Sequence, residues 1–175
     1  MLNEYLGVGI SFFIQYIPLA LIIFCAFTVI KFLIKRKVEF KFLIMLCEIL
    51  WITTVLVILK ITGITVENIK LIFLFDGNVN CSFNLIGDGV SMATFLNVIM
   101  FIPLGFLTPI IFPRLQKKWL YTILLGFIFS ISIELIQIFV GRFVQLNDVL
   151  MNTLGVFIGY EIWYFLLKRR NKQYD

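Results

Sequence analysis

Two strongly apolar stretches near the C-terminal end carry small and polar residues at helical spacing. In the first stretch these residues follow one another at steps of four, four, three and four: Gly126, Ser130, Glu134, Gln137 and Gly141. Such steps align side chains on one face of an α-helix. A carboxylate beside a carboxamide on that face can act as a general base or can hold a polar ligand. Small residues on the same face let a second helix approach closely.

The second stretch repeats the pattern with Asp148, Asn152, Gly155 and Gly159 at steps of four, three and four. Gly155 and Gly159 form a small-xxx-small pair, and we interpret both as structural residues that pack helices together. Asn147 or Asp148 is expected to cap the start of the helix. Because only a few residues separate the two stretches, they should form an antiparallel hairpin whose polar faces meet.

A third apolar stretch, "FLNVIMFIPLGFLTP", contributes Asn97 near its start. Pro103 and Pro109 remove the backbone hydrogen bonds that the carbonyls of Ile99 and Gly105 would accept in a regular helix. A carbonyl freed by a kink inside a membrane needs a partner, and that partner can be a substrate. We interpret Pro103 and Gly105 as structural residues.

These residues require helices that cross a membrane. The chain has 175 residues, 61% hydrophobic and 14% charged, whereas a soluble domain is about 45–50% apolar and about 25% charged. Five segments reach the roughly 20 apolar residues that a membrane-crossing helix needs: about 7–30, 42–60, 94–112, 119–141 and 148–167. Hydrocarbon tolerates no unpaired backbone groups. The sequence therefore predicts an all-α, polytopic transmembrane helical bundle in one membrane domain, 1–175.

Most of the 15 basic residues fall in three clusters, all on one side of the membrane if there are five spans: Lys31, Lys35, Arg36, Lys37 and Lys41; Arg114, Lys117 and Lys118; Lys168, Arg169, Arg170 and Lys172. The positive-inside rule makes that side cytoplasmic, with the N-terminus outside and the C-terminus inside. The long loop 61–88 then lies outside. Its "LIFLF" segment, 71–75, is expected to lie in the interface or to cap the bundle.

Six polar residues should converge in the outer half of the bilayer, given a rise of about 1.5 Å per helical residue. A carboxylate at mid-bilayer costs about 2.5–3.5 kcal/mol on insertion scales, so it needs a partner, a water cavity or a function. We interpret the set as a ligand-binding site, with no catalytic residue assigned: Asn97, Glu134, Gln137, Arg142, Asp148 and Asn152. The structural interpretation is that these side chains only join helices through hydrogen bonds. Glu48 and Glu161 lie toward the cytoplasmic half and are interpreted as structural or snorkelling residues.

The composition also excludes several classes of function. The net charge of +5 resides in loop clusters rather than on one basic face, so no nucleic acid is expected as a partner. Histidine is absent and the three cysteines lack metal-ligand spacing, so neither a metal nor another cofactor is expected. The first apolar run is too long for the core of a cleavable signal peptide and is better interpreted as a span.

Three ordered motifs resemble the VanZ-like family of membrane proteins, which includes one associated with teicoplanin resistance in glycopeptide-resistant bacteria. They are "NVIMFIPLGFL" at 97–107, "SISIELIQ" at 130–137 and "GRFVQLNDVLMNTLGVFIGY" at 141–160, and "NLIG" at 84–87 adds a short fourth match. The resemblance covers about 84–160. It carries over to Asn97, Phe101, Pro103 and Gly105, to Glu134 and Gln137, and to Arg142, Asp148, Asn152 and Gly155. Relatives often have further acidic residues where this chain has Gln145 and Asn147, which weakens any case for a divalent metal.

The resemblance implies a protein of the bacterial cytoplasmic membrane that lowers susceptibility to teicoplanin-type lipoglycopeptides. Its partners would be membrane lipids and a lipid-linked cell-wall precursor or the lipidated drug, with Arg142 contacting an anionic headgroup. An intramembrane enzyme acting on a lipid headgroup is the first alternative, with Glu134 as general base and Asp148 as second carboxylate. A small lipid transporter that moves about the proline-containing span is the second alternative, and a pure scaffold is the third.

Overall fold

The computed structural model describes residues 2–35, 41–70, 81–82, 92–142 and 144–168. The chain divides into two compact units, Met1–Val57 and Ile58–Asp175. Several predicted features lie outside the described residues: the "LIFLF" segment, the "NLIG" motif, and the basic residues Arg36, Lys37, Arg169, Arg170 and Lys172.

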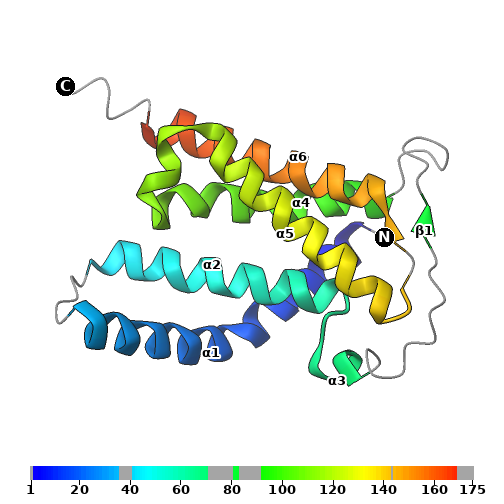
Figure 1. Ribbon diagram of the computed structural model, residues 1–175, viewed down its shortest axis with the longest axis horizontal. Helices are drawn as coiled ribbons and strands as arrows, with labels where there is room; N and C mark the ends of the chain where they lie inside the picture. Colours follow the sequence, from blue (N-terminus) through cyan, green and yellow to red (C-terminus); the bar gives the residue numbers. More distant parts are fainter. Residues whose placement is uncertain (1, 36–40, 71–80, 83–91, 143, 169–175) are drawn as a thin grey trace. The chain divides into compact units, whose positions relative to one another are not determined.

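Five helices in the described chain are long and apolar enough to cross a membrane. They are α1 (Leu2–Lys35), α2 (Phe42–Ile61), α4 (Met92–Ile111), α5 (Trp119–Phe139) and α6 (Leu146–Trp163), labelled in Figure 1. Their positions agree with the expected segments to within a few residues, so the prediction of an all-α bundle with five spans is confirmed. The side on which each terminus lies stays a prediction, as does the single membrane domain.

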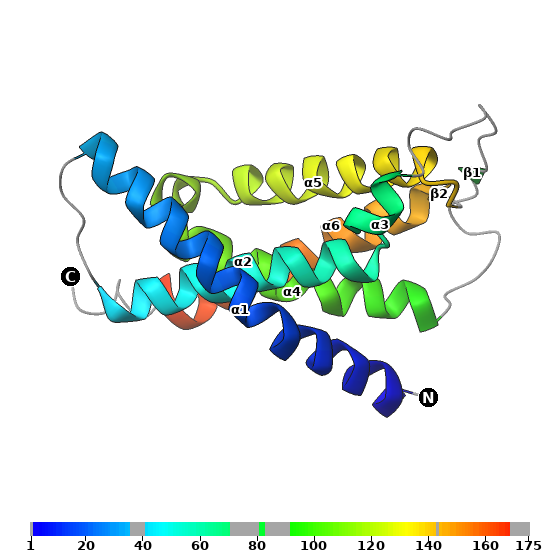
Figure 2. The same cartoon turned by 90° about the horizontal axis from the view of Figure 1, so that it is seen from below.

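Short elements connect the long helices. They are α3 (Val66–Ile69), the strands β1 (Cys81–Ser82) and β2 (Val144–Gln145), the 3₁₀ helix η2 (Pro113–Lys117) and the π-helical turn η3 (Tyr164–Lys168). β1 and β2 pair in parallel, with Cys81 opposite Val144 and Ser82 opposite Gln145. Figure 2 shows this pair beyond the end of α5. The pairing was not predicted, because two residues per strand are too few to produce a periodic pattern.

In the first unit, α1 continues through Lys35 instead of ending at the expected residue 30. Lysine is a good helix former, and its long stem lets the charged group reach out of an apolar surface. The Lys31 ammonium uses this reach to form a 2.8 Å ion pair with Glu48 of α2. Glu48 thus has a structural partner, in agreement with its interpretation from the sequence.

In the second unit, α4 and α6 pack closely and run in the same direction, while α5 runs antiparallel to α6 (Figure 1). Glycines make the close packing possible. A Cβ atom at any of three glycines would collide with a backbone carbonyl oxygen of the facing helix: Gly105 with Val156, Gly155 with Val98 and Gly159 with Ile102. The small-xxx-small pair of α6 therefore faces α4, and no larger residue fits there without separating the helices.

α4 remains one helix through both prolines. Pro103 lies on its exposed side and Pro109 is buried. Near the second proline, the Thr108 hydroxyl donates a 2.6 Å hydrogen bond to the Leu104 carbonyl, and the Gln116 amide donates one of 2.6 Å to the Pro109 carbonyl. The Pro109 carbonyl faces Pro113 four residues on, which has no N–H, so the Gln116 side chain supplies the hydrogen bond that the backbone cannot.

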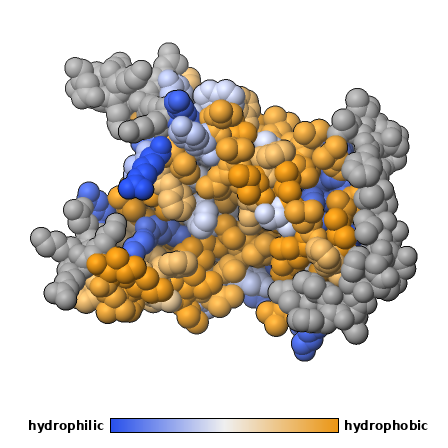
Figure 3. All heavy atoms as spheres, viewed as in Figure 1, coloured by the Kyte–Doolittle hydropathy of each residue, from blue (hydrophilic) through white to orange (hydrophobic). Residues whose placement is uncertain are grey.

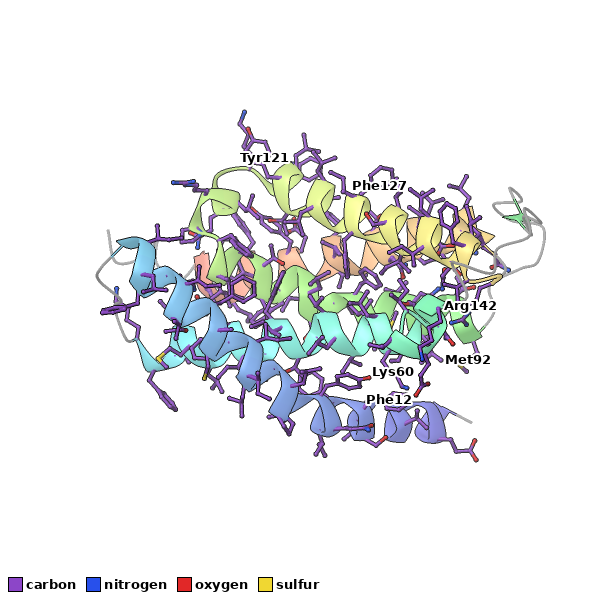
Figure 4. The ribbon with its side chains drawn as sticks, turned by 60° about the horizontal axis from the view of Figure 1, so that its bottom comes forward. Phe12, Lys60, Met92, Tyr121, Phe127 and Arg142 are labelled. Carbon is purple, nitrogen blue, oxygen red and sulfur yellow. The ribbon has the colours of Figure 1, made fainter. Side chains whose placement is uncertain are left out.

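The outer faces of the helices are apolar. Large hydrophobic side chains are exposed along all five, and Figure 3 shows them covering most of the face in view. On α5, Tyr121 and Phe127 point away from the helices packed against it (Figure 4). The buried side of α5 is instead mostly small or polar: Thr122, Gly126, Ser130, Ile133, Glu134 and Gln137. This distribution is the reverse of a water-soluble helix and suits a lipid environment.

Candidate functional site

The polar faces of α5 and α6 meet, as their spacing predicts. The Asn152 side-chain amide donates a 2.9 Å hydrogen bond to the hydroxyl of Ser130. Both residues are almost completely buried, Asn152 at 2% exposure and Ser130 at 0%. Its spacing predicted Ser130 on the polar face of the helix, but Ser130 was not among the predicted site residues. Its hydroxyl accepts the hydrogen bond that holds the Asn152 side chain in place.

Asp148 joins α6 to α4. Its carboxylate Oδ1 accepts a 2.8 Å hydrogen bond from the Asn97 side-chain amide. The expectation that Asn147 or Asp148 caps the helix is wrong: Gln145 occupies the cap position, without a side-chain hydrogen bond, and α6 begins at Leu146. β2 ends at Gln145 and α6 follows directly, two residues before the expected start. Asp148 therefore lies in the first turn, past the cap position, and its carboxylate is available to α4.

Glu134 supplies a buried carboxylate to this group of polar residues. It is 6% exposed, and its Oε2 accepts a 3.3 Å hydrogen bond from the backbone N–H of Gln145. The same Gln145 pairs with Ser82 in the two-stranded sheet. Glu134 also interacts electrostatically with Asp148 and with Arg142. A carboxylate, a second carboxylate and a guanidinium therefore share one small region of the second unit.

Residues of the turn that follows α2 contact two of the predicted site residues, Gln137 and Arg142. The Gln137 side-chain amide donates a 2.8 Å hydrogen bond to the Thr62 carbonyl. The Arg142 side chain (labelled in Figure 4) packs directly over Gly63, and a Cβ there would displace the guanidinium. Gly63 has φ +81°, a conformation that favours glycine. Sequence reasoning missed Thr62 and Gly63, although a glycine just past an apolar helix is a recognised stop signal.

Two buried oxygen atoms of the site lack a hydrogen-bond partner among the described residues: Oε1 of Gln137 and Oδ1 of Asn152. Gln137 lies three residues after Glu134, and the partner of Asn152, Ser130, lies four residues before it. Along α5, Gln137 and the Ser130 that contacts Asn152 therefore lie about one helical turn to each side of Glu134. A third such atom, Thr122 Oγ1, lies two turns beyond Ser130, away from the carboxylates.

The six predicted residues thus lie in one region of the second unit, but they are not equally enclosed. Glu134, Gln137 and Asn152 are buried, Asn97 and Asp148 are half-buried, and Arg142 is exposed at the rim. Among the described residues, no group of three or more Asp, Glu, Cys or His side chains is arranged to hold a metal ion. The cluster can accept hydrogen bonds, and its rim offers a guanidinium. That it binds a ligand stays a prediction.

Comparison with known proteins adds one match. The family model described as VanZ/LLP1 matches residues 10–168. This match extends beyond the 84–160 region of the sequence resemblance and includes most of the first two spans. No curated protein and no solved structure matches the chain. Five apolar helices and a family match over nearly the whole length make this a multi-pass membrane protein, and the chain belongs to the VanZ/LLP1 family.

Proposed function

We propose that this chain acts in the bacterial cytoplasmic membrane, where it lowers susceptibility to teicoplanin-type lipoglycopeptides. Its polar cluster would bind the headgroup region of a lipid-linked cell-wall precursor or of the lipidated drug, in the outer half of the bilayer. The single observation that carries this proposal is the buried polar cluster of Glu134, Gln137 and Asn152, which includes two acceptor oxygens with no partner among the described residues.

The energetic cost of these groups argues for a ligand. An unsatisfied buried polar atom costs about 1–3 kcal/mol, and a carboxylate within the bilayer adds a further cost. Helix packing alone does not need unpaired acceptors, since apolar residues of the same volume would fill the space without this cost. A ligand that donates hydrogen bonds to Gln137, Asn152 and Glu134 would offset the cost.

Arg142 suits the entrance of such a site. Its side chain is exposed and lies over Gly63, while its backbone N–H donates a 3.0 Å hydrogen bond to the Gln137 carbonyl. This bond fixes the residue to the end of α5. A guanidinium pairs well with phosphate and carboxylate groups, so Arg142 would contact the anionic part of a headgroup as the buried groups receive the rest.

The direct test is teicoplanin susceptibility in a susceptible host that expresses the wild-type chain, Glu134→Gln, Arg142→Ala or Asn152→Ala, with membrane levels measured. We expect the wild-type chain to raise the inhibitory concentration and the three variants to lose this protection at equal levels. Glu161→Gln is the matched control, because it makes the same chemical change at an exposed position of α6. Protection by every variant would refute the assignment of the cluster, and no protection by wild type would refute the proposed activity.

The closeness of two carboxylates and a guanidinium also favours a second candidate, an enzyme that acts on a lipid headgroup. Glu134 would be the general base, and Arg142 would stabilise developing negative charge. Incubation of the purified protein with cell-wall lipids, followed by mass spectrometry of the products, separates the two candidates. Turnover that Glu134→Gln abolishes would favour the enzyme; recovery of unchanged lipid with protection intact would favour binding alone.

A further inference from the structure

The buried part of the polar cluster contains two acceptor oxygens that no described residue pairs with. The side-chain nitrogens of Asn97, Gln137 and Asn152 each donate to a protein oxygen. The oxygens of the last two, Oε1 and Oδ1, have no partner among the described residues. Both side chains are more than nine-tenths buried, at 8% and 2% exposure. A group that pairs with these two oxygens must donate hydrogen bonds.

The charges select among the possible donors. Glu134 is buried, and it interacts electrostatically with Asp148, a second carboxylate. Arg142, a cation that also interacts electrostatically with Glu134, is exposed at the rim. Two carboxylates in a poorly solvated region favour a positively charged neighbour, because desolvation weakens their interaction with water. A neutral hydroxyl group would satisfy one acceptor and would leave the charge uncompensated.

On this basis we propose that the cluster recognises the primary ammonium group of a zwitterionic lipid headgroup. An ammonium carries a positive charge and three N–H donors, which suit the Glu134 carboxylate together with an unpaired oxygen next to it, Gln137 Oε1 or Asn152 Oδ1. The phosphate of the same headgroup would lie toward Arg142 at the rim. This inference rests on the proposed binding function and deepens it, since it names the headgroup chemistry.

The test compares lipids that differ only in the headgroup. Purified full-length protein is titrated with phosphatidylethanolamine, phosphatidylcholine and phosphatidylglycerol of identical acyl chains, and bound lipid is measured by native mass spectrometry. Ethanolamine and choline headgroups are both cationic, but only ethanolamine has N–H donors. We expect phosphatidylethanolamine to bind at least about tenfold more tightly than phosphatidylcholine, equivalent to about 1.4 kcal/mol.

Two variants locate the effect. Glu134→Gln and Asp148→Asn each keep the shape of the side chain and remove one charge, and each should reduce the preference to about twofold or less, a small difference in free energy. Glu161→Gln should retain the full preference. Soluble phosphoethanolamine serves as a competitor that has the ammonium and phosphate but no acyl chains. It should compete weakly if the ligand is a lipid.

Several results would overturn the inference. Equal binding of the ethanolamine and choline lipids would exclude recognition by N–H donors, and tighter binding of phosphatidylglycerol would indicate a hydroxyl ligand. Competition by soluble phosphoethanolamine as strong as by the lipid would exclude a lipid source. If both carboxylate variants still prefer phosphatidylethanolamine, the headgroup binds somewhere other than this cluster. These outcomes are independent of teicoplanin susceptibility, so a failure of the proposed function and a failure of this inference can be distinguished.

Discussion

Individual side chains decide how α4, α5 and α6 recognise one another. Two of the helix pairs have a polar contact of their own: Asn97 of α4 with Asp148 of α6, and Asn152 of α6 with Ser130 of α5. In hydrocarbon, such contacts contribute modestly, about 0.6 kcal/mol on average and up to about 1.7 kcal/mol. Their value to the fold therefore lies as much in fixing the position of each side chain as in stability.

The contact between Asn97 and Asp148 gives a first prediction. Asn97→Ala should destabilise the protein, because it leaves the half-buried Asp148 carboxylate without its 2.8 Å donor. A double-mutant cycle with Asp148→Ala should give a coupling free energy of about 0.5–2 kcal/mol. The measurement is unfolding of the purified protein in mixed micelles with increasing denaturing detergent. Ser132→Ala, an exposed change on α5, is the control, and additive effects of the two site changes would contradict the predicted contact.

Gly63 gives a second prediction, which separates backbone strain from side-chain position. Gly63→Ala introduces a Cβ where the Arg142 guanidinium now lies, whereas Gly141→Ala meets nothing within 4 Å. Both glycines have positive φ, 81° and 72°, so both changes carry a similar strain of roughly 1 kcal/mol. We expect similar melting temperatures for the two variants, but loss of teicoplanin protection only in Gly63→Ala. Equal protection by both would show that the position of Arg142 is unimportant.

At the scale of elements, the second unit uses its glycines and its polar residues for different neighbours. Gly155 and Gly159 of α6 face the backbone of α4, while Asn152 faces α5. α6 therefore packs tightly against one helix through small residues and is positioned against the other by hydrogen bonds. Close backbone approach gives van der Waals contact, which drives helix association where no hydrophobic effect operates between helices.

A third prediction follows from this close packing. Gly159→Ala should destabilise the protein by about 1–3 kcal/mol or more, because the new Cβ would collide with the Ile102 backbone carbonyl, which cannot move aside as a side chain can. Gly9→Ala on α1 is the matched control, since nothing lies within 4 Å of its position. Loss of the folded species is measured by fluorescence-detected size exclusion after heating. Equal thermal stability of the two variants would contradict the predicted collision.

The long helices could be predicted from the sequence because a hydrophobic run of sufficient length has few other solutions. The polar faces of α5 and α6 could be predicted for a similar reason, since helical spacing fixes which residues share a face. The hydrogen-bond partners of the site residues could not all be predicted. Glu134 accepts from the backbone of Gln145, and Gln137 donates to the backbone of Thr62. Backbone groups are present at every residue, so no residue type marks them in a sequence.

The helices of both units expose large apolar side chains, and the candidate site lies at one end of the second unit. The candidate site lies where α5 is connected to α6, near the start of α4 and the end of α2. If each of the five long helices crosses the membrane, this end lies on the side opposite to the clusters of lysine and arginine. The proposed function depends on that orientation, because teicoplanin-type drugs would meet the protein from outside the cell.

Orientation is therefore the last prediction. In a background without native cysteines, Glu67→Cys in α3 and Arg114→Cys in η2 introduce thiols at exposed positions on opposite sides of the predicted topology. We expect a membrane-impermeant maleimide to label Glu67→Cys in intact cells and Arg114→Cys only after the cells are permeabilised, because basic loops are retained in the cytoplasm. The reverse pattern would place the Glu134 cluster in the inner half of the bilayer. It would then remain a candidate headgroup site, but for a ligand on the cytoplasmic side, and protection against an external drug would need another explanation.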